Sequence, residues 1–317
     1  MNKKVLITGY SGFVGSNLAE YLHQKVQIQG LSRSAETKPG LLDEVFTWDE
    51  LSIEKLSGTD CIVHLAGKAH DLKNTSNAAE YFTVNTELTK TLFDLFIKSS
   101  ASDFIYFSSV KAVADSVDGT LTETTVPDPK TPYGQSKQQA EDYLLKTTPP
   151  PGKRLFIIRP CMIHGPGNKG NLNLLYKFVV KRIPYPFAAF TNKRSFLSVD
   201  NLCYIIERII CDNIIPGGIY NIADDESLST NEVVKIISET SGVKDKLWRI
   251  SPMLLKAIAS VGDRLHLPLN SERLKKLTES YIVSNDKIKR VLQITHLPLS
   301  SKDGLRKTIA SFGSARS

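Results

Sequence analysis

The sequence predicts an α/β fold, a doubly wound parallel sheet with a smaller, interleaved second part. Short apolar runs rich in β-branched residues alternate with segments of helical spacing as far as Pro160. After Pro160 this alternation ends, and glycine and proline become frequent. Strands that alternate with helices pair in parallel, because each crossover returns the chain to the same end of the sheet.

The predicted strands are apolar runs that end at small or polar residues. We expect them at residues 5–8, 26–31, 61–65, 104–107, 155–159 and 218–222, and Pro160 closes the fifth.

The predicted helices repeat apolar residues at intervals of three or four. The first covers residues 13–23, with Phe13, Val14, Leu18 and Leu22 on one side. We expect others at 79–98, 133–145 and 198–210, followed by a C-terminal third that is helical and more polar.

The composition is that of a globular protein, with a formal net charge of +7 at pH 7. Lys and Arg are scattered rather than clustered, which argues against a nucleic-acid partner. The four cysteines show no metal-ligand spacing and stand among apolar residues, so we expect buried thiols, no disulfide and no metal site. Glycines interrupt the first apolar run, and no later stretch is apolar enough for a membrane span, so we expect a cytoplasmic protein.

A glycine-rich loop follows the first strand directly and opens the first helix. Gly9, Gly12 and Gly15 allow a tight turn, close approach of a pyrophosphate, and close packing of helix on strand. The helix N-terminus then offers free N–H groups and a partial positive charge to the anion. This context predicts a dinucleotide-binding site.

The end of the second strand bears on which dinucleotide binds. An acidic residue commonly binds the adenosine ribose there, but this chain has Ser32 and Arg33. An arginine can pair with a 2′-phosphate, which favours NADP over NAD. The alternative is that Arg33 is a solvated surface residue.

A candidate catalytic group combines Ser109, at the end of a strand, with Tyr133 and Lys137, four residues apart on one helix face. A phenol with a pKa near ~10 is a poor base at neutral pH. A nearby ammonium favours the phenolate, and the serine hydroxyl can bond the same substrate oxygen. Tyr-x-x-x-Lys spacing alone is common on helices, but its combination with the glycine loop and a strand-end serine is specific.

These motifs resemble the extended short-chain dehydrogenases/reductases, the NAD-dependent epimerase/dehydratase family. The resemblance also rests on residues 64–67, Asn85, Arg159-Pro160, residues 164–167 and residues 194–200, and so covers nearly the whole chain. Within the family, the chain is most similar to UDP-sugar 4-epimerase-like proteins, including quinovosamine-pathway 4-ketosugar reductases.

The resemblance implies roles for matching positions. Tyr133 would exchange a proton with a sugar hydroxyl, Lys137 would bind the nicotinamide ribose, and Ser109 would orient the sugar oxygen. The implied cofactor-binding residues are Gly9, Ser11, Gly12, Phe13, Val14, Gly15, Ser32, Arg33, Leu65, Ala66, Gly67, Asn85, Tyr133, Lys137 and Pro160.

The resemblance implies a nucleotide-diphosphate sugar, UDP-linked, as the partner molecule. Asn171 and Arg194 would grip its diphosphate, with Arg273 as a weaker second clamp. Phe187 would either cover the base or belong to the core. Lys68 and Ser109 would meet the sugar, and His70 would do the same or remain a solvated loop residue.

The architecture that follows has a dinucleotide-binding domain at residues 1–165, with a return segment at about 197–223. Residues 166–196 and 224–317 would form the substrate-binding domain. The resemblance also implies a homodimer built from the helices at 79–98 and 133–145, although the same apolar faces also pack on a sheet.

Departures from the family pattern narrow the chemistry. Val110 and Lys111 follow Ser109 where 4,6-dehydratases carry an acidic pair, and Lys111 stands where 3,5-epimerases carry a cysteine. What remains is hydride transfer at carbon 4 of the sugar. The absent ribose acid favours a 4-ketosugar reductase slightly over a 4-epimerase that keeps its NAD bound. A non-catalytic NADP-binding sensor is a third reading, and the intact Ser109, Tyr133 and Lys137 argue against it.

Overall fold

The computed structural model describes residues 3–33, 40–68, 77–168, 170–265, 267 and 269–314. Its centre is a seven-stranded sheet with the strand order β10-β7-β5-β4-β1-β2-β3, in which every pair is parallel. The strands are β1 (Lys4–Thr8), β2 (Gln27–Ser32), β3 (Glu44–Thr47), β4 (Cys61–His64), β5 (Asp103–Phe107), β7 (Arg154–Pro160) and β10 (Gly218–Ile222). The order reverses between β1 and β4, which confirms the doubly wound parallel sheet.

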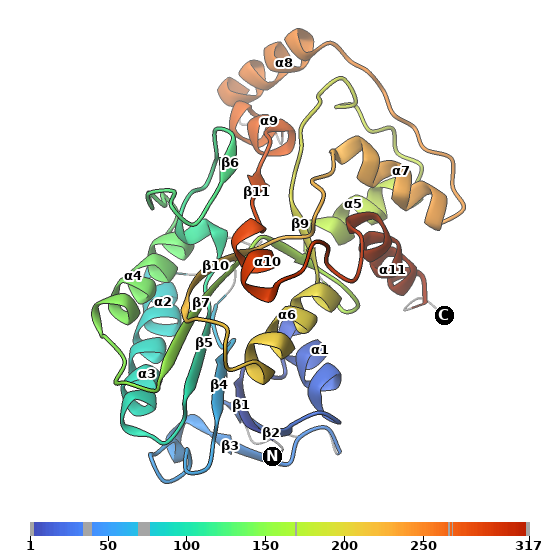
Figure 1. Cartoon of the computed structure of the whole chain (residues 1–317). Helices are drawn as coiled ribbons and strands as arrows, with labels where there is room; N and C mark the ends of the chain where they lie inside the picture. The colour runs from blue at the N-terminus through green and yellow to red at the C-terminus, as the bar shows by residue number, and fades with distance from the viewer. Residues whose placement is uncertain are drawn as a thin grey trace.

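Helices cover both faces of this sheet (Figure 1). α1 (Phe13–Leu22) and α6 (Val199–Cys211) lie on one face, and α2 (Ala78–Phe82), α3 (Leu88–Lys98) and α4 (Pro132–Lys146) lie on the other. Side chains alternate between the two faces of a strand. Val5 and Ile7 of β1 therefore pack with Leu18 of α1, whereas Leu6 packs with Leu92 of α3.

The second part of the molecule has its own apolar core beside the carboxyl ends of the sheet strands. β8 (Met162–His164) pairs in parallel with β9 (Phe196–Ser198), and α5 (Asn171–Val180), α7 (Thr230–Thr240) and α11 (Ser301–Ser314) pack around them. The remaining elements are β6 (Thr120–Leu121), β11 (Ile282–Val283), α8 (Pro252–Leu265), α9 (Ser271–Thr278) and α10 (Asp286–Leu292). The exact division into two domains stays a prediction.

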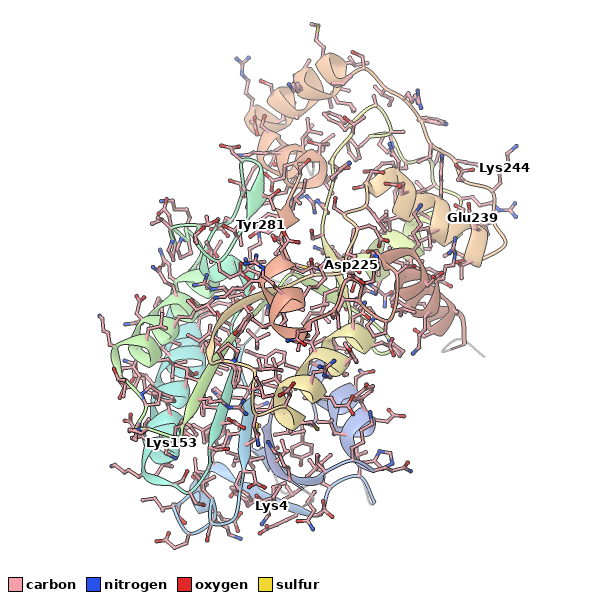
Figure 2. All side chains as sticks on the ribbon, in the orientation of Figure 1. Lys4, Lys153, Asp225, Glu239, Lys244 and Tyr281 are labelled. Atoms are coloured by element: carbon pink, nitrogen blue, oxygen red, sulfur yellow. The ribbon has the colours of Figure 1, made fainter. Side chains whose placement is uncertain are left out.

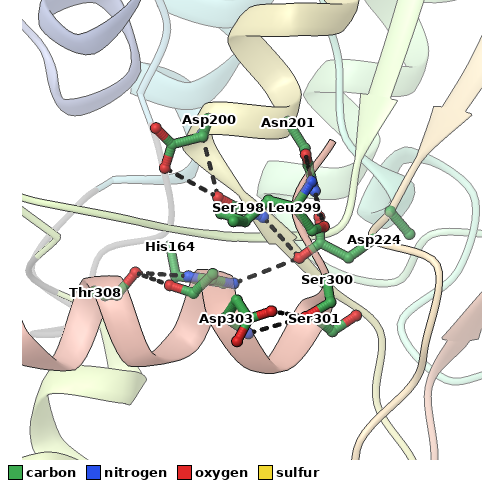
Figure 3. Close-up of polar contacts among 12 residues, drawn as sticks. His164, Ser198, Asp200, Asn201, Asp224, Leu299, Ser300, Ser301, Asp303 and Thr308 are labelled. Carbon is green, nitrogen blue, oxygen red and sulfur yellow. Dashed lines mark hydrogen bonds and ion pairs between the residues drawn. The ribbon is translucent and has the colours of Figure 1, made fainter. Parts of the chain in front are cut away.

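A buried polar network joins the two parts (Figure 3). Asp224, just after β10, accepts hydrogen bonds from the Ser198 N–H at 2.9 Å and from the Asn201 side chain at 2.7 Å. Asn201 also bonds the main chain of Leu299, ahead of α11. On the other side, the His164 ring bonds Thr308 of α11 at 2.8 Å, and its Nε2 lies 3.7 Å from Asp224 Oδ2. These bonds hold β9, α6 and α11 in fixed relation.

The predicted strands at 5–8, 26–31, 61–65, 104–107 and 218–222 match the observed ones to within a residue at each end. The strand predicted at 155–159 matches β7 equally well, since β7 has one more residue at each end and Pro160 is its last residue. Pro160 pairs in register with Ile222, and the next residue, Cys161, donates to the Ile222 carbonyl at 3.0 Å. The edge strand β3 was not predicted, because its four residues include only two apolar side chains.

Two further corrections concern a helix and a cysteine. The helix predicted at 79–98 is interrupted by a wider π-helical turn at Thr83–Glu87. Cys61, Cys161 and Cys203 are buried, but Cys211 is exposed, because it ends α6 next to the surface residue Asp212.

Within the described ranges, no three His, Cys, Asp or Glu side chains gather as metal ligands would. None of the helices described there has the length and apolar character needed to cross a membrane.

Candidate active site

The candidate active site lies where the carboxyl ends of β4, β5 and β7 meet, next to the reversal in strand order. Ligands of doubly wound sheets bind at this position. A cavity of about 240 Å³ opens here. It is lined by Val14, Leu65, Gly67, Lys68, Phe107, Ser108, Ser109, Tyr133, Lys137, Pro160, Cys161 and Ile163. Eight of the twelve lining residues are predicted site residues.

The glycine loop has the geometry of a phosphate cradle. Gly9 has a φ of +68°, and a Cβ there would stand 2.9 Å from the Ala66 nitrogen. A Cβ on Gly15 would stand 2.3 Å from the Gly9 carbonyl oxygen. α1 begins at Phe13, and no side chain among the described residues caps its N-terminus. Its first N–H groups thus remain available to an anion.

Gly67 lines the first cavity and leaves space there because it has no side chain. A Cβ there would stand 3.0 Å from Asn85 Oδ1 and 3.1 Å from Lys137 Nζ, so any side chain would fill the space in front of these two groups. The loop and this open space together fit a nicotinamide dinucleotide. Its pyrophosphate would lie at Gly9–Gly15 and its ring beside Lys137.

Asn85 owes its position to the π-helical turn between α2 and α3. The extra residue of such a turn re-aims a side chain, and these turns are frequent at functional sites. The fully buried Asn85 accepts from the Lys68 N–H at 2.7 Å and donates to the Lys68 carbonyl at 3.1 Å and to Ser136 Oγ at 3.0 Å. Asn85 therefore fixes the chain after β4 against α4.

Ser109, Tyr133 and Lys137 come together as predicted, although their electrostatics differ from the prediction. Thr131 caps α4, which begins at Pro132, so Tyr133 and Lys137 lie in the first two turns. Lys137 Nζ donates to the Phe107 carbonyl at 2.8 Å. Burial raises the pKa of Tyr133, a side-chain hydrogen bond with Ser109 opposes that rise, and Lys137 is not among the described groups that shift it. Burial also lowers the pKa of Lys137 to about 8.

A buried ion pair stands behind this group, and the sequence analysis missed it. Glu141 accepts two hydrogen bonds from Arg159 Nε, at 3.0 and 3.1 Å, and further bonds from Arg159 Nη2 and Ser108 Oγ. The Glu141 charge acts against the lowering of the Lys137 pKa. The signal was present in the sequence, since Glu141 follows Lys137 by four residues and shares its helix face.

The predicted substrate-binding residues gather, in part, around a second cavity of about 420 Å³. Asn171, Phe187 and Arg194 line it together, and β8 contributes residues to both cavities. Arg194 Nε donates to the Glu279 carbonyl at 3.3 Å, and Nη2 donates to the Lys276 carbonyl. Burial lowers the pKa of Arg194.

Arg273 and Lys68, two further predicted substrate contacts, do not line the second cavity. Arg273 is exposed on α9 and lines neither cavity; the residues of α9 that reach the second cavity are Lys276 and Leu277, because these occupy the next turn. Lys68 lines the first cavity, where its Nζ pairs with Glu80 at 2.5 Å. His70 falls outside the described residues.

Lys111 is a further candidate that the sequence analysis did not assign to the site. Its Nζ donates to the Asp115 carbonyl at 2.8 Å and lies 4.3 Å from the centre of the Tyr281 ring (labelled in Figure 2). Burial lowers the pKa of Lys111, and the positive charges of Arg194 and Lys276 add to this lowering. Lys111 and Arg194 are thus half-buried cations in one region, and the carboxylates of Asp115 and Glu279 act on the pKa of Lys111 in the opposite direction.

The predicted adenosine-binding residues Ser32 and Arg33 lie at the end of β2. Ser32 is the last residue of β2, Arg33 follows it and is exposed, and the Gly9 N–H donates to the Leu31 carbonyl at 3.1 Å. The loop and the end of β2 are therefore adjacent.

Comparisons with known proteins agree with this fold. The model of the NAD dependent epimerase/dehydratase family matches residues 5–223. UDP-glucose 4-epimerase of Vibrio cholerae is 35% identical over 249 residues, covering 74% of this chain and 75% of that one. N-acetyl-alpha-D-glucosaminyl-diphospho-ditrans,octacis-undecaprenol 4-epimerase of Escherichia coli O157:H7 is 30% identical, covering 77% and 74%.

The solved structure of UDP-glucuronic acid 4-epimerase from Bacillus cereus in complex with NAD superposes with a TM-score of 0.76 at 19% identity, over 99% of this chain and 100% of that one. The fold is therefore of the Rossmann type. The chain belongs to the NAD dependent epimerase/dehydratase family and is an enzyme of that family.

Proposed function

We propose that this enzyme acts at carbon 4 of a hexose carried on a nucleoside diphosphate, with a UDP-linked hexose derivative as substrate. The observation that carries the proposal is the convergence of Ser109, Tyr133 and Lys137 on one cavity beside the glycine loop. A bound nicotinamide supplies the site that accepts and returns hydride. The protein supplies the proton transfer and the orientation of the sugar.

Each residue of the group has a distinct task in this proposal. Tyr133 takes and returns the proton of the carbon 4 hydroxyl, and Ser109 donates a hydrogen bond to the same oxygen. Lys137, held by the Phe107 carbonyl, binds the nicotinamide ribose. Val110 and Lys111 offer no carboxylate for water elimination, so carbon 4 is the reacting centre.

The second cavity supports a nucleoside diphosphate as the carrier of the sugar. Arg194 and Asn171 would bind its diphosphate there, together with Lys276, which also lines the cavity. Lys111 lines neither cavity and would act on the diphosphate as a further positive charge from beside Tyr281. Phe187, whose ring packs edge-on against Tyr185 at 5.5 Å, offers an apolar wall to the base. Both relatives described above are named for sugars joined to diphosphates.

Between the two carbon 4 reactions, we propose the 4-epimerase. Both relatives described above are named 4-epimerases, and the Bacillus cereus enzyme holds NAD. The 4-ketosugar reductase, favoured slightly by the sequence, rests on the exposed Arg33 and its possible contact with the 2′-phosphate of NADP. The comparisons give the NADP preference no support.

Product and cofactor analysis separates the two reactions. The purified enzyme is incubated with UDP-glucose and with UDP-N-acetylglucosamine without added cofactor, and the products are identified by NMR. An epimerase forms the carbon 4 epimer with no net change in nicotinamide absorbance. Strict dependence on stoichiometric NADPH and a 4-keto sugar would overturn the epimerase in favour of the reductase.

We further propose a cytoplasmic homodimer that pairs α3 and α4 across a two-fold axis. Leu145 on α4 is 52% exposed, so the helix presents apolar surface outward. Light scattering after size exclusion tests this: a mass near twice that of one chain supports the dimer, and a monomer mass at micromolar concentration contradicts it.

A further inference from the structure

α8 lies at the end of the molecule farthest from the seven-stranded sheet, with α9 beside it (Figure 1). One side of α8 is buried: Leu255 and Ala259 pack with Leu274 of α9, and Phe187 and Phe190 pack against this cluster. This small core holds the helix firmly to the rest of the second part.

The neighbouring side of α8 is apolar but open to solvent. Leu254, Ile258, Val261 and Leu265 follow one another at intervals of four, three and four residues, which places them in a single stripe on the helix. Their exposed fractions are 54%, 44%, 51% and 64%. An exposed, contiguous apolar stripe of this kind marks an interaction surface.

Trp248 is a further exposed apolar residue, on the segment that leads into α8. Its main chain is fixed by hydrogen bonds with Tyr185 and Ala188, whereas its side chain is 56% exposed. We call Trp248, Leu254, Ile258, Val261 and Leu265 the α8 surface. Tryptophan is enriched where proteins meet the boundary between lipid and water, because one end of the ring is apolar and the other can hydrogen-bond.

The surroundings of the α8 surface are basic. Residues 249–279 contain six Lys and Arg, all exposed, against three Asp and Glu. This segment therefore carries +3 of the net charge of +7 in about a tenth of the chain. α8 itself carries Lys256, Arg264 and the acidic Asp263, and Arg249 stands on the segment just before it. An apolar stripe within basic surroundings matches an anionic lipid surface in both polarity and charge.

We propose that the α8 surface docks the enzyme on a bilayer rich in anionic lipids. A second copy of the chain fits the surface less well. Four half-exposed aliphatic side chains on one helix offer well under the roughly 800 Å² per partner of a stable interface, and two copies would bring like charges together. The buried side of α8 packs on Phe187, which also lines the second cavity, so docking would hold the diphosphate-binding region close to the lipid headgroups.

The chain offers a direct reporter, since Trp48 and Trp248 are its two tryptophans. In the Trp48→Phe variant all tryptophan emission comes from Trp248. Vesicles of phosphatidylglycerol and phosphatidylcholine in equal parts should shift this emission to shorter wavelength and carry the protein upward on flotation. Vesicles of phosphatidylcholine alone should bind at least tenfold more weakly, and 0.5 M salt should weaken binding to the anionic vesicles.

The variant Ile258→Asn/Val261→Asn should lose the emission shift and the flotation. A matched control is Val126→Asn/Ile214→Asn, which changes two more exposed aliphatic residues outside α8 and α9, at 82% and 89% exposure, and should bind like the parent. Equal binding by both variants, or no binding to anionic vesicles, would overturn the proposal. Concentration-dependent self-association without vesicle binding, abolished by the α8 variant, would instead identify a second copy as the occupant. Because activity is measured on water-soluble UDP-sugars, either failure leaves the proposed function untouched.

Discussion

Burial destabilises the charged form of Lys137, and the place of this residue in the candidate active site accounts for it. Its ammonium is buried, and its pKa falls from 10.5 to about 8. At neutral pH the charged group must therefore be held at a cost of roughly 3 kcal/mol, at about 1.4 kcal/mol per unit. Cation–π contact with Tyr106 at 4.9 Å and the bond to Phe107 keep it in place. Natural sites often accept such a cost where chemistry requires the charge.

The Lys137→Met variant should therefore be more stable than the parent at pH 7, by about 1–3 kcal/mol, while losing activity. Between pH 8 and 10.5 the unfolded parent chain holds more protons than the folded one, so the parent gains stability as pH rises through this window. The advantage of the variant should shrink accordingly. Urea unfolding at pH 7, 8 and 9.5 measures it, and a gap that stays constant or widens would contradict the assignment.

From the sequence, Lys111 is notable only for the residues that it replaces in the family pattern after Ser109. It stands where the family pattern has an acid or a cysteine, and the structure adds that it is a half-buried cation near Arg194. That proximity arises because Tyr281, which contacts Lys111, pairs through its backbone with Arg194. The sequence separation of these residues hid the arrangement.

Lys111→Met should weaken UDP binding about 10- to 100-fold, the loss expected for a hydrogen bond between charged groups, and should leave uridine binding unchanged. Lys153→Met is the matched control. Lys153 also lies on an aromatic ring, 4.5 Å from the centre of Phe96, and bonds main-chain carbonyls, but Figure 2 shows it far from Tyr281. Calorimetry with UDP and uridine measures both. Equal UDP affinity in parent and Lys111→Met would remove Lys111 from the site.

At the scale of elements, the loop between β1 and α1 could be read from the sequence because its requirements are local. Three glycines after an apolar strand and before a helix specify the turn without any knowledge of the rest of the chain. β3 could not be found this way, since an edge strand of four residues depends on its neighbour β2 for its conformation. The π-helical turn at Asn85 was equally hidden, because it follows from contacts with Lys68 and Ser136.

Gly15→Ala tests the loop. The added Cβ would stand 2.3 Å from the Gly9 oxygen and 2.6 Å from the Tyr10 Cα, both backbone atoms, so the loop must shift. NAD should bind at least tenfold more weakly. Gly313→Ala, also in a helix, places its Cβ no closer than 3.9 Å to its surroundings and should leave NAD affinity unchanged. Unaltered NAD binding in Gly15→Ala, measured by fluorescence titration, would show that the cradle lies elsewhere.

At the scale of the whole molecule, the union of the two parts rests on Asp224 and its partners. Predicting it requires that Ser198, Asn201 and the chain before α11 meet beyond the end of β10, and no short-range pattern encodes this. The alternation of strands and helices predicted the sheet. The second cavity, in contrast, depends on how segments more than 80 residues apart, such as Arg194 and Lys276, come together.

Asp224→Ala should lower the free energy of unfolding by about 2–4 kcal/mol, because it leaves the buried Ser198 N–H and the Asn201 amide without their acceptor. Asp303→Ala, which removes an exposed carboxylate of α11, should cost far less. Urea unfolding of both variants checks the difference, and losses of similar size would show that the network does not hold the two parts together.

The measurement that most directly tests the account is the turnover of Tyr133→Phe on the UDP-sugar that the parent converts, with NAD affinity measured on the same protein. Loss of the proton-transferring hydroxyl should reduce kcat by about 10²- to 10⁴-fold and leave the NAD Kd within about threefold. Tyr143 lies on α4 like Tyr133, and its hydroxyl bonds Asp94 of α3. The Tyr143→Phe variant removes that hydroxyl and should retain full activity. A Tyr133→Phe enzyme that turns over within tenfold of the parent would contradict the placement of the chemistry at this phenol.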